Sequence, residues 1–320
     1  MDDIDYSVVI RTTGQASEKY IALLDSIQLL NPLPKEIIVV LPKGSSEPSY
    51  QLGWETFYFS QKGMVSQRMY GIAMCKTKYA LVSDDDISFD SDFVMKLYEP
   101  IKERLCKFSA GPLYSFLPRK GINSLICTVF GSAAPTIFHK ENYCTILNTT
   151  GYSYNRNLND NVKYYFAESL PWTCFFAETA SIKKIDMESE DWLDKHGYAS
   201  FDDTTMFYKA HLMGLNSIVV SDAIYNHLDA RTSTKGNSAN VIFSTGFNRF
   251  VFWHRFIYKG QNNCVGKLWS KICFSYNTFW NIVMQYISDK SFGVSTFIKG
   301  HKSAKKYINS DEYMSLPSVF

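Results

Sequence analysis

The first 41 residues contain a strand-like, a helix-like and a second strand-like segment, in that order. Residues 6–10 are a β-branched apolar run, and apolar residues then recur at helical spacing from residue 20 to residue 30. Asn31-Pro32 ends the helical pattern, and residues 36–41 are again apolar. Two strands joined by a helix over about 35 residues predict a right-handed βαβ unit and therefore a parallel sheet.

A later strand-like run, at residues 79–82, is followed by three consecutive carboxylates, Asp84, Asp85 and Asp86. Like charges a few Å apart repel and raise one another's pKa, so such a triplet is tolerated in full solvent or around a divalent cation. Side chains two apart along an extended chain share a face. Asp84 and Asp86 are therefore expected to point together, while Asp85 points away.

Two interpretations of this triplet remain open from the residues alone. Open α/β sheets bind ligands at the carboxyl ends of their strands, which favours a metal site. Asp and Ser are also turn and N-cap residues, and Ser91 stands just before the apolar series of a following helix, which favours a solvated turn. A strand at 55–59 and an amphipathic helix at 65–73 complete a Rossmann-like half, with a mixed, mainly parallel sheet flanked by helices.

Composition excludes several classes of protein. The 320 residues are 46% hydrophobic with a net charge of +2, which fits one large α/β domain with an appendage, and neither a disordered chain nor a highly basic nucleic-acid binder. The seven cysteines include no C-x-x-C pair, so neither a zinc site nor a disulfide framework is indicated. Asp2, Asp3 and Asp5 occupy the place of a signal peptide's basic region, so we expect a cytoplasmic protein.

The second half of the chain divides into an ordered block and a helical extension. Strands are expected at 124–130, 173–177 and 217–220, with a polar loop at 149–161 and a helix that opens at Asp202-Asp203 and ends at Gly214. Composition shifts after residue 233. We therefore expect one large domain at 1–232, in two parts at 1–110 and 111–232, and a C-terminal helical extension at 233–320.

Residues 247–287 of the extension interleave aromatic side chains with Arg and Lys. No window approaches the roughly 20 uninterrupted apolar residues of a membrane-spanning helix. Two interpretations remain: an amphipathic region at a membrane interface, or helices that pack their aromatic faces back onto the catalytic domain.

Three blocks together resemble the family 2 glycosyltransferases, which have the GT-A fold and invert the anomeric centre. They are Ser-Val-Val-Ile-Arg-Thr at 7–12, Gly-Met-Val-Ser-Gln-Arg-Met-Tyr-Gly-Ile at 63–72 and the Asp84–Asp86 triplet, which falls where the family keeps its metal-binding D-x-D motif. The resemblance implies transfer of a sugar from a nucleotide-diphosphate sugar to a glycan or lipid-linked acceptor in bacterial polysaccharide assembly. It also implies no nucleic-acid partner, and it leaves room for docking on the inner leaflet of the cell membrane.

The same resemblance makes residues 1–232 a catalytic domain, with a nucleotide-binding half at 1–110 and an acceptor-binding half at 111–232. It also assigns roles to individual residues. Asp203 is expected to be the catalytic base, with Asp191 of the nearby Glu190-Asp191 pair as a rival. Trp172 and Asp202 are expected on the acceptor side. Mg²⁺ or Mn²⁺ would be held by Asp86, Asp84 and His227. The residues expected to contact the nucleotide sugar are Arg11, Thr12, Thr13, Arg68, Asp84 and Asp85.

One departure and three rival interpretations remain. Family members commonly end the second strand with an Asp that reads the base, whereas residues 40–44 contain no acid. A non-catalytic nucleotide-sugar-binding protein is therefore one alternative. A sugar nucleotidyltransferase usually has a Gly-rich basic loop after the first strand, and residues 12–15 lack it. A structural Ca²⁺ site is disfavoured because the 12-residue EF-hand pattern is absent.

Overall fold

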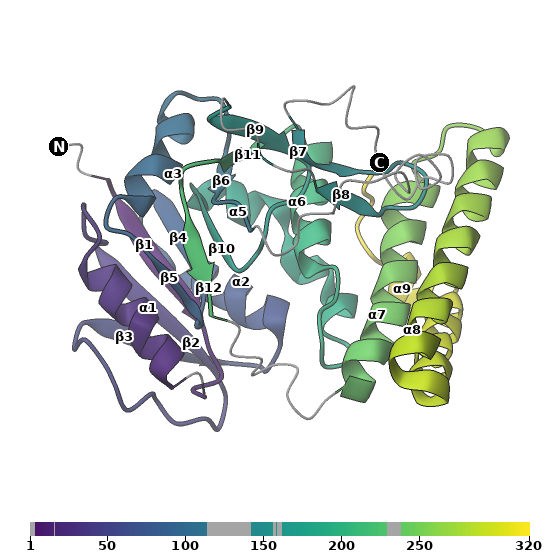
Figure 1. Cartoon of the computed structure of the whole chain (residues 1–320), viewed down its shortest axis with the longest axis horizontal. Coiled ribbons are helices and arrows are strands. Elements are labelled where there is room, and N and C mark those ends of the chain that lie inside the picture. Colours follow the sequence, from purple (N-terminus) through teal and green to yellow (C-terminus); the bar gives the residue numbers. More distant parts are fainter. Residues whose placement is uncertain (1–3, 16, 114–141, 156–157, 159–161, 229–237) are drawn as a thin grey trace.

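The computed structural model describes residues 4–15, 17–113, 142–155, 158, 162–228 and 238–320 (Figure 1). The strand expected at 124–130 lies outside these residues. Within them, ten strands form one sheet in the order β3-β2-β1-β4-β10-β6-β11-β9-β7-β8. Their bounds are β1 (Tyr6–Arg11), β2 (Glu36–Pro42), β3 (Glu55–Ser60), β4 (Tyr79–Asp84), β6 (Phe108–Ala110), β7 (Asn142–Ile146), β8 (Ser153–Asn155), β9 (Tyr164–Ala167), β10 (Cys174–Glu178) and β11 (Ser217–Val220).

The N-terminal half of the sheet is parallel, as the βαβ pattern predicts. β1 lies between β2 and β4 and runs parallel to both, and β2 is also parallel to β3. β10 interrupts this order because it pairs antiparallel with both β4 and β6. The strands β1, β2 and β4 are almost wholly buried, in keeping with their continuous apolar runs.

Helices cover both faces of the sheet. One core cluster joins α1 (Glu18–Gln28) and α3 (Phe93–Lys102) to one face, through residues such as Leu24 and Leu97. The other core cluster joins α2 (Met64–Met74), α5 (Thr179–Ile185) and α6 (Asp202–Leu212) to the opposite face, through residues such as Ile72, Ile182 and Phe207. The layers are therefore helix, sheet and helix.

The polar segment expected to be a loop at 149–161 contains a strand. β8 pairs antiparallel with β7, with Cys144 opposite Asn155. Gly151 lies in the left-handed region at φ 68° and allows the tight reversal between the two strands. The sequence did not predict this strand, because the segment is rich in turn-forming residues and a short edge strand needs few apolar ones.

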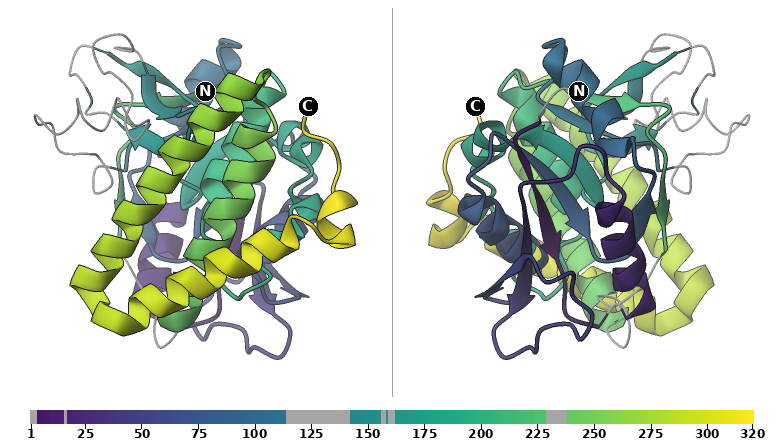
Figure 2. Two further views of the ribbon diagram at one scale, coloured as in Figure 1. Left: turned by 90° about the vertical axis from the view of Figure 1, so that its right-hand side faces the viewer. Right: turned by 90° about the vertical axis from the view of Figure 1, so that its left-hand side faces the viewer.

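The C-terminal region is helical. It contains α7 (Ser238–Phe252), a π-helical segment (Trp253–Tyr258), α8 (Cys264–Tyr307) and α9 (Asp311–Met314). α8 runs beside α7 and then changes direction (Figure 2). Within the described part of the chain, no helix has both the length and the apolar content that a membrane span requires.

The burial of the aromatic side chains differs between α7 and α8. Phe247, Phe252 and Phe256 are buried in the core that they share with α6 and the sheet. The aromatic side chains of Phe279 and Trp280 on α8 are instead 57% and 47% exposed. Packing of aromatic faces back onto residues 1–232 therefore describes α7 and the π-helical segment. α8 has exposed aromatic side chains, and its place at a membrane interface stays a prediction.

A buried ion pair joins the C-terminal helices to the rest of the protein. Glu190 is fully buried and accepts hydrogen bonds from Nε and Nη2 of Arg255 over 2.8 and 2.9 Å. It also accepts from Nζ of Lys209 over 2.9 Å and from Nε1 of Trp192 over 2.8 Å. Glu190 therefore has a structural role and is no longer part of a rival acidic pair for catalysis.

Candidate active site

Arg68 of α2 connects the carboxyl end of β4 to the start of α6. Its side chain is 2% exposed, and its Nη2 donates to Oδ1 and Oδ2 of Asp84 over 2.7 and 3.0 Å. Its Nη1 donates to Oδ2 of Asp202 over 2.7 Å. Asp84 ends β4 and Asp202 begins α6, so one guanidinium links the edge of the sheet to the helix that carries Asp203. Arg11, at the end of β1, adds a contact from Nε to Oδ1 of Asp84 over 3.2 Å.

Burial and neighbouring charges shift the pKa values of Arg68 and Asp202 in opposite directions. Burial alone would lower the pKa of Arg68, but the carboxylates of Asp84 and Asp202 outweigh it and the pKa is raised, so the guanidinium is charged. Burial raises the pKa of Asp202 to about 7, against the opposing effect of Arg68. Asp202 therefore titrates near neutral pH, and Asp84, which both arginines contact, is the principal counter-ion of Arg68.

Asp85 supports the turn that follows β1. The Oγ1 of Thr12 donates to Oδ2 of Asp85 over 2.5 Å and accepts from the backbone N–H of Gly14 over 2.9 Å. Burial raises the pKa of Asp85 to about 6. The Oγ1 of Thr13 is buried and has no hydrogen-bond partner in the described part of the chain.

Asp86 lies beside His227. The short strand β5 (Ile87–Phe89) pairs antiparallel with β12 (Tyr225–His227), so that His227 stands opposite Ile87. The Nε2 of His227 is 3.5 Å from Oδ1 of Asp86. A carboxylate and an imidazole suit Mn²⁺, and a carboxylate suits Mg²⁺. Among the described residues no three His, Cys, Asp or Glu side chains converge as a metal cluster, so this pair would need ligands from substrate and water.

Each of the three consecutive aspartates thus has its own contacts. Asp84 contacts the two arginines, Asp85 contacts Thr12, and Asp86 lies beside His227. The solvated-turn interpretation is wrong, since all three residues are less than 9% exposed. The metal roles of Asp84, Asp86 and His227 stay predictions.

Asp203 and Trp172, both expected on the acceptor side, lie close to the Arg68 cluster, and their roles stay predictions. Oδ1 of Asp203 accepts from the backbone N–H of Thr204 over 2.6 Å, and burial raises the pKa of Asp203. The ring of Trp172 lies under the guanidinium of Arg68, with Cζ 4.9 Å from its centroid. The rival Asp191 is exposed and lines a separate small pocket with Ser66 and Met69.

Sequence reasoning missed three residues that shape this site. Gln67 donates from Nε2 to the carbonyls of Thr12 and Val40 over 3.0 and 3.1 Å, which fixes the ends of β1 and β2. The charges of Asp202 and Asp203 add to burial in raising the pKa of Tyr198, so its phenol lies near both. Asp194 caps α2 by accepting from the N–H groups of Met64 and Ser66 over 2.8 and 2.9 Å. The one available signal was Gly63, which precedes α2 without a capping side chain.

No family model matches the chain, and no curated protein matches its sequence. Among solved structures, the fold resembles the crystal structure of GalNAc-T7 with UDP, GalNAc and Mn²⁺, with a TM-score of 0.53 and 11% identity over 86% of this chain. The chain has a GT-A fold. It spans 55% of the length of that GalNAc-T7 structure. The mannosyltransferase PcManGT from Pyrobaculum calidifontis, in complex with GDP-Man and Mn²⁺, matches with a TM-score of 0.47 and 10% identity over 98% of this chain and 79% of that one.

Proposed function

We propose that this protein is an inverting glycosyltransferase of family 2 that moves a sugar from a nucleotide-diphosphate sugar to a hydroxyl of a glycan or lipid-linked acceptor, in bacterial surface polysaccharide synthesis. One observation carries the proposal. Arg68 joins Asp84, at the carboxyl edge of the sheet, to Asp202, the neighbour of Asp203, within 3.0 Å on both sides. The donor-side and acceptor-side carboxylates that the resemblance requires therefore meet in one buried cluster.

The donor diphosphate would lie at the carboxyl ends of β1 and β4, as ligands do in open α/β sheets. Arg11 and the free hydroxyl of Thr13 face this edge after β1, and both suit phosphate or ribose oxygens. The Asp86–His227 pair would hold Mg²⁺ or Mn²⁺. When bound, this cation supplies positive charge opposite the departing diphosphate. The Mn²⁺ in the GalNAc-T7 structure is in keeping with this assignment.

Asp203 would take the proton of the acceptor hydroxyl. A general base works best when its pKa lies near the working pH, and burial moves the pKa of Asp203 in that direction. Trp172 would form a wall of the acceptor site. Its ring packs against Arg68, and aromatic faces pack well against both sugars and cations.

Turnover of a nucleotide-sugar panel with Mn²⁺ tests the assignment of the base. Asp203→Asn is expected to stay folded and to lose about 10²–10⁴-fold in the rate of nucleoside diphosphate release, the usual worth of a general base. Asp191→Asn is the matched control and is expected to keep the rate. If Asp191→Asn lost the rate of release and Asp203→Asn kept it, Asp191 would be the base. If the native protein released no nucleoside diphosphate, a non-catalytic binding protein would be favoured.

We also propose that the protein is cytoplasmic and peripheral to the inner face of the cell membrane, where a lipid-linked acceptor would be presented. The exposed aromatic face of α8 supports this location.

A further inference from the structure

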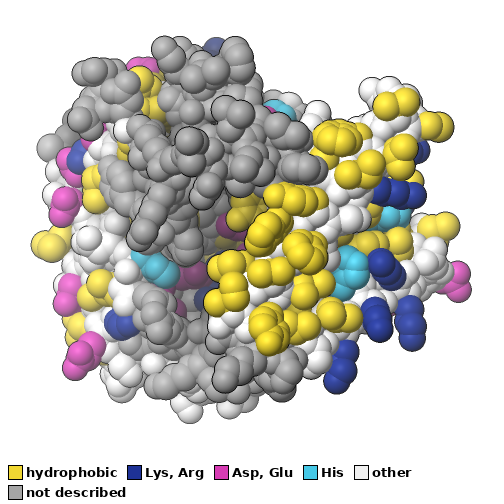
Figure 3. Space-filling view, turned by 45° about the vertical axis from the view of Figure 1, so that its right-hand side comes forward, with side chains coloured by type: hydrophobic (Ala, Val, Ile, Leu, Met, Phe, Trp, Pro, Cys, Tyr) yellow, Lys and Arg dark blue, Asp and Glu magenta, His cyan; other side chains and the backbone are white. Residues whose placement is uncertain are grey.

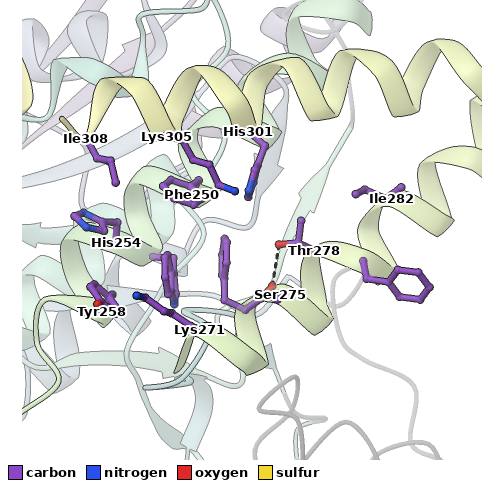
Figure 4. A pocket seen from close by; sticks show the side chains of 13 residues that line it. Phe250, His254, Tyr258, Lys271, Ser275, Thr278, Ile282, His301, Lys305 and Ile308 are labelled. Atoms are coloured by element: carbon purple, nitrogen blue, oxygen red, sulfur yellow. Dashed lines mark hydrogen bonds between the residues drawn. The ribbon is translucent and has the colours of Figure 1, made fainter. Parts of the chain in front are cut away.

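A sizeable pocket lies in the C-terminal helices, and none of the carboxylates Asp84, Asp202 and Asp203 lines it. It has a volume of about 650 Å³ and is bounded by α7, the π-helical segment and both arms of α8, which are the stretches before and after the change of direction in this helix (Figure 2). Phe250, Phe274 and Ile282 are among its apolar walls, and Lys271 and Lys305 enter from different arms of α8 (Figure 4). Its size and apolar lining are those of a small-molecule site.

The charge of this pocket has one sign. Its lining in the described structure has no Asp or Glu, whereas Lys271 and Lys305 contribute positive charge. Burial lowers the pKa of the lining residues His254 and His301 to about 4, so their imidazoles are neutral at pH 7. Neither lysine has a carboxylate partner in the described part of the chain. Each lies over an aromatic ring instead, with Nζ of Lys271 5.1 Å from the centroid of Tyr258 and Nζ of Lys305 5.9 Å from that of Phe250. An anion is the ligand that such a lining attracts.

Arg249 is a second and independent sign of an anion. It is 4% exposed, and its Nη2 has no hydrogen-bond partner among the residues that the structure describes. Its guanidinium carbon lies 5.4 Å from the ring of Phe274, which is a wall of the pocket. Its charge also lowers the pKa of His301, another lining residue, after burial and Lys305. A buried cation without a counter-ion is costly, and an anion in the pocket would offset that cost.

The pocket opens onto an apolar surface. Phe279 lines the pocket and is 57% exposed. Along the same arm of α8, apolar side chains gather on the surface with Lys and Arg side chains beside them (Figure 3). The exposed members of this α8 face include Val265, Leu268, Trp269, Ile272, Phe279, Trp280, Met284 and Ile287. A contiguous exposed apolar face rimmed by cations is typical of a helix that lies in a lipid interface.

We propose that this pocket binds an anionic lipid, with a phosphate at Lys271 and Lys305 and its hydrocarbon chain on the aromatic wall and the α8 face. The shared chemistry is a phosphate on a long apolar chain, which a bilayer phospholipid or an isoprenoid phosphate would supply. The proposal deepens the membrane location given above and rests on the C-terminal helices, so loss of catalysis would leave it standing.

Co-sedimentation of the full chain with vesicles tests the anionic preference. The protein is expected to bind phosphatidylcholine vesicles that contain phosphatidylglycerol more tightly than phosphatidylcholine alone. The double variant Lys271→Ala/Lys305→Ala should lose about 30-fold in partitioning to the anionic vesicles, the equivalent of roughly 1 kcal/mol for each cation at such a surface. The control pair Lys76→Ala/Lys184→Ala removes two exposed charges from the catalytic domain and should bind like the native protein. Equal loss in both pairs, or none in either, contradicts the proposal.

A second pair of variants tests the apolar contribution. Phe279→Ser/Trp280→Ser should weaken binding to every vesicle, whereas Leu29→Ser/Leu33→Ser, also exposed but on the catalytic domain, should not. Unchanged binding by the α8 pair contradicts the proposal.

Neutral vesicles doped with an isoprenoid phosphate, matched in charge to the phosphatidylglycerol vesicles, then identify the source of the phosphate. Stronger binding to these vesicles indicates the isoprenoid phosphate, and equal binding indicates a bilayer lipid. Failure to bind either anionic vesicle better than neutral ones overturns the site.

Discussion

The Nη1 of Arg68 lies 2.7 Å from Oδ2 of Asp202, although 134 positions separate the two residues along the chain. This contact connects α2, which packs against β1 and β2, to the first turn of α6. The same guanidinium also holds Asp84. Both carboxylates are thereby positioned by a single buried side chain, which makes Arg68 the residue on which the geometry of the proposed site depends.

Arg68→Leu is expected to lower the free energy of unfolding by about 3–5 kcal/mol, because it leaves the buried Asp202 without its cation and Asp84 with Arg11 alone. Urea denaturation measures this loss. Lys96→Met is the control, since it breaks the more exposed ion pair of Lys96 with Asp92, at 2.9 Å, and should cost less than about 1 kcal/mol. A loss below about 1 kcal/mol for Arg68→Leu would mean that water or a relaxed side chain replaces the guanidinium.

Glu190→Gln should be about as destabilising, roughly 3–5 kcal/mol, because Arg255 and Lys209 would remain buried without an anion. Glu312→Gln is the matched control, because its ion pair with Lys195 is exposed. Equal and small losses in the two variants would show that Arg255 finds another partner.

The effect of Glu190 should also depend on pH. Burial would raise its pKa, but the hydrogen bond from Arg255 and the charges of Lys209 and Arg255 outweigh burial, so the folded-state pKa lies below the ordinary value. Its contribution to stability is therefore present above the unfolded-state pKa of about 4.3 and is lost as pH falls through the folded-state pKa. The difference in unfolding free energy between the native protein and Glu190→Gln should narrow at acid pH. A constant difference would contradict this sign.

Gly71→Ala is expected to destabilise the protein by about 1–3 kcal/mol through overpacking. A Cβ at Gly71 would lie 2.6 Å from Cγ1 of Val9 and 2.9 Å from Cγ2 of Val40, so α2 would have to move away from β1 and β2. Gly266→Ala is the control, because the nearest atom to its Cβ is Oε1 of Gln261, the end of a flexible side chain, at 2.9 Å. That variant should be neutral or gain up to about 1 kcal/mol from helix propensity. Thermal unfolding compares them, and equal effects would contradict the close packing of α2.

The sequence predicted most elements of the fold but not how the later ones pair. Runs such as residues 36–41 and 217–220 coincide with β2 and β11, because continuous apolar sequence is typical of buried strands. The antiparallel insertion of β10 between β4 and β6 was not predictable, since it depends on long connections whose path leaves no local pattern.

For the site, the sequence identified individual residues but not their contacts. Arg68, Asp84 and Asp202 were each expected to be functional, yet no spacing rule connects residues this far apart. For Glu190, the sequence suggested a function that the structure does not support. It was considered with Asp191 as an acidic pair for catalysis, and only its burial against Arg255 revealed a structural role.

The most direct test is whether a nucleotide binds at the carboxylate edge together with a metal ion. Thermal unfolding would be followed with UDP, GDP, dTDP and CMP, each with Mn²⁺ or EDTA, for the native protein, Asp86→Ala and the exposed control Asp92→Ala. At 100 times its Kd a ligand stabilises by about 2.7 kcal/mol. We predict that one nucleotide raises the Tm with Mn²⁺ but not with EDTA, and that Asp86→Ala alone abolishes the shift. A Tm unmoved by every nucleotide, or a shift that survives Asp86→Ala, would contradict the proposed donor site.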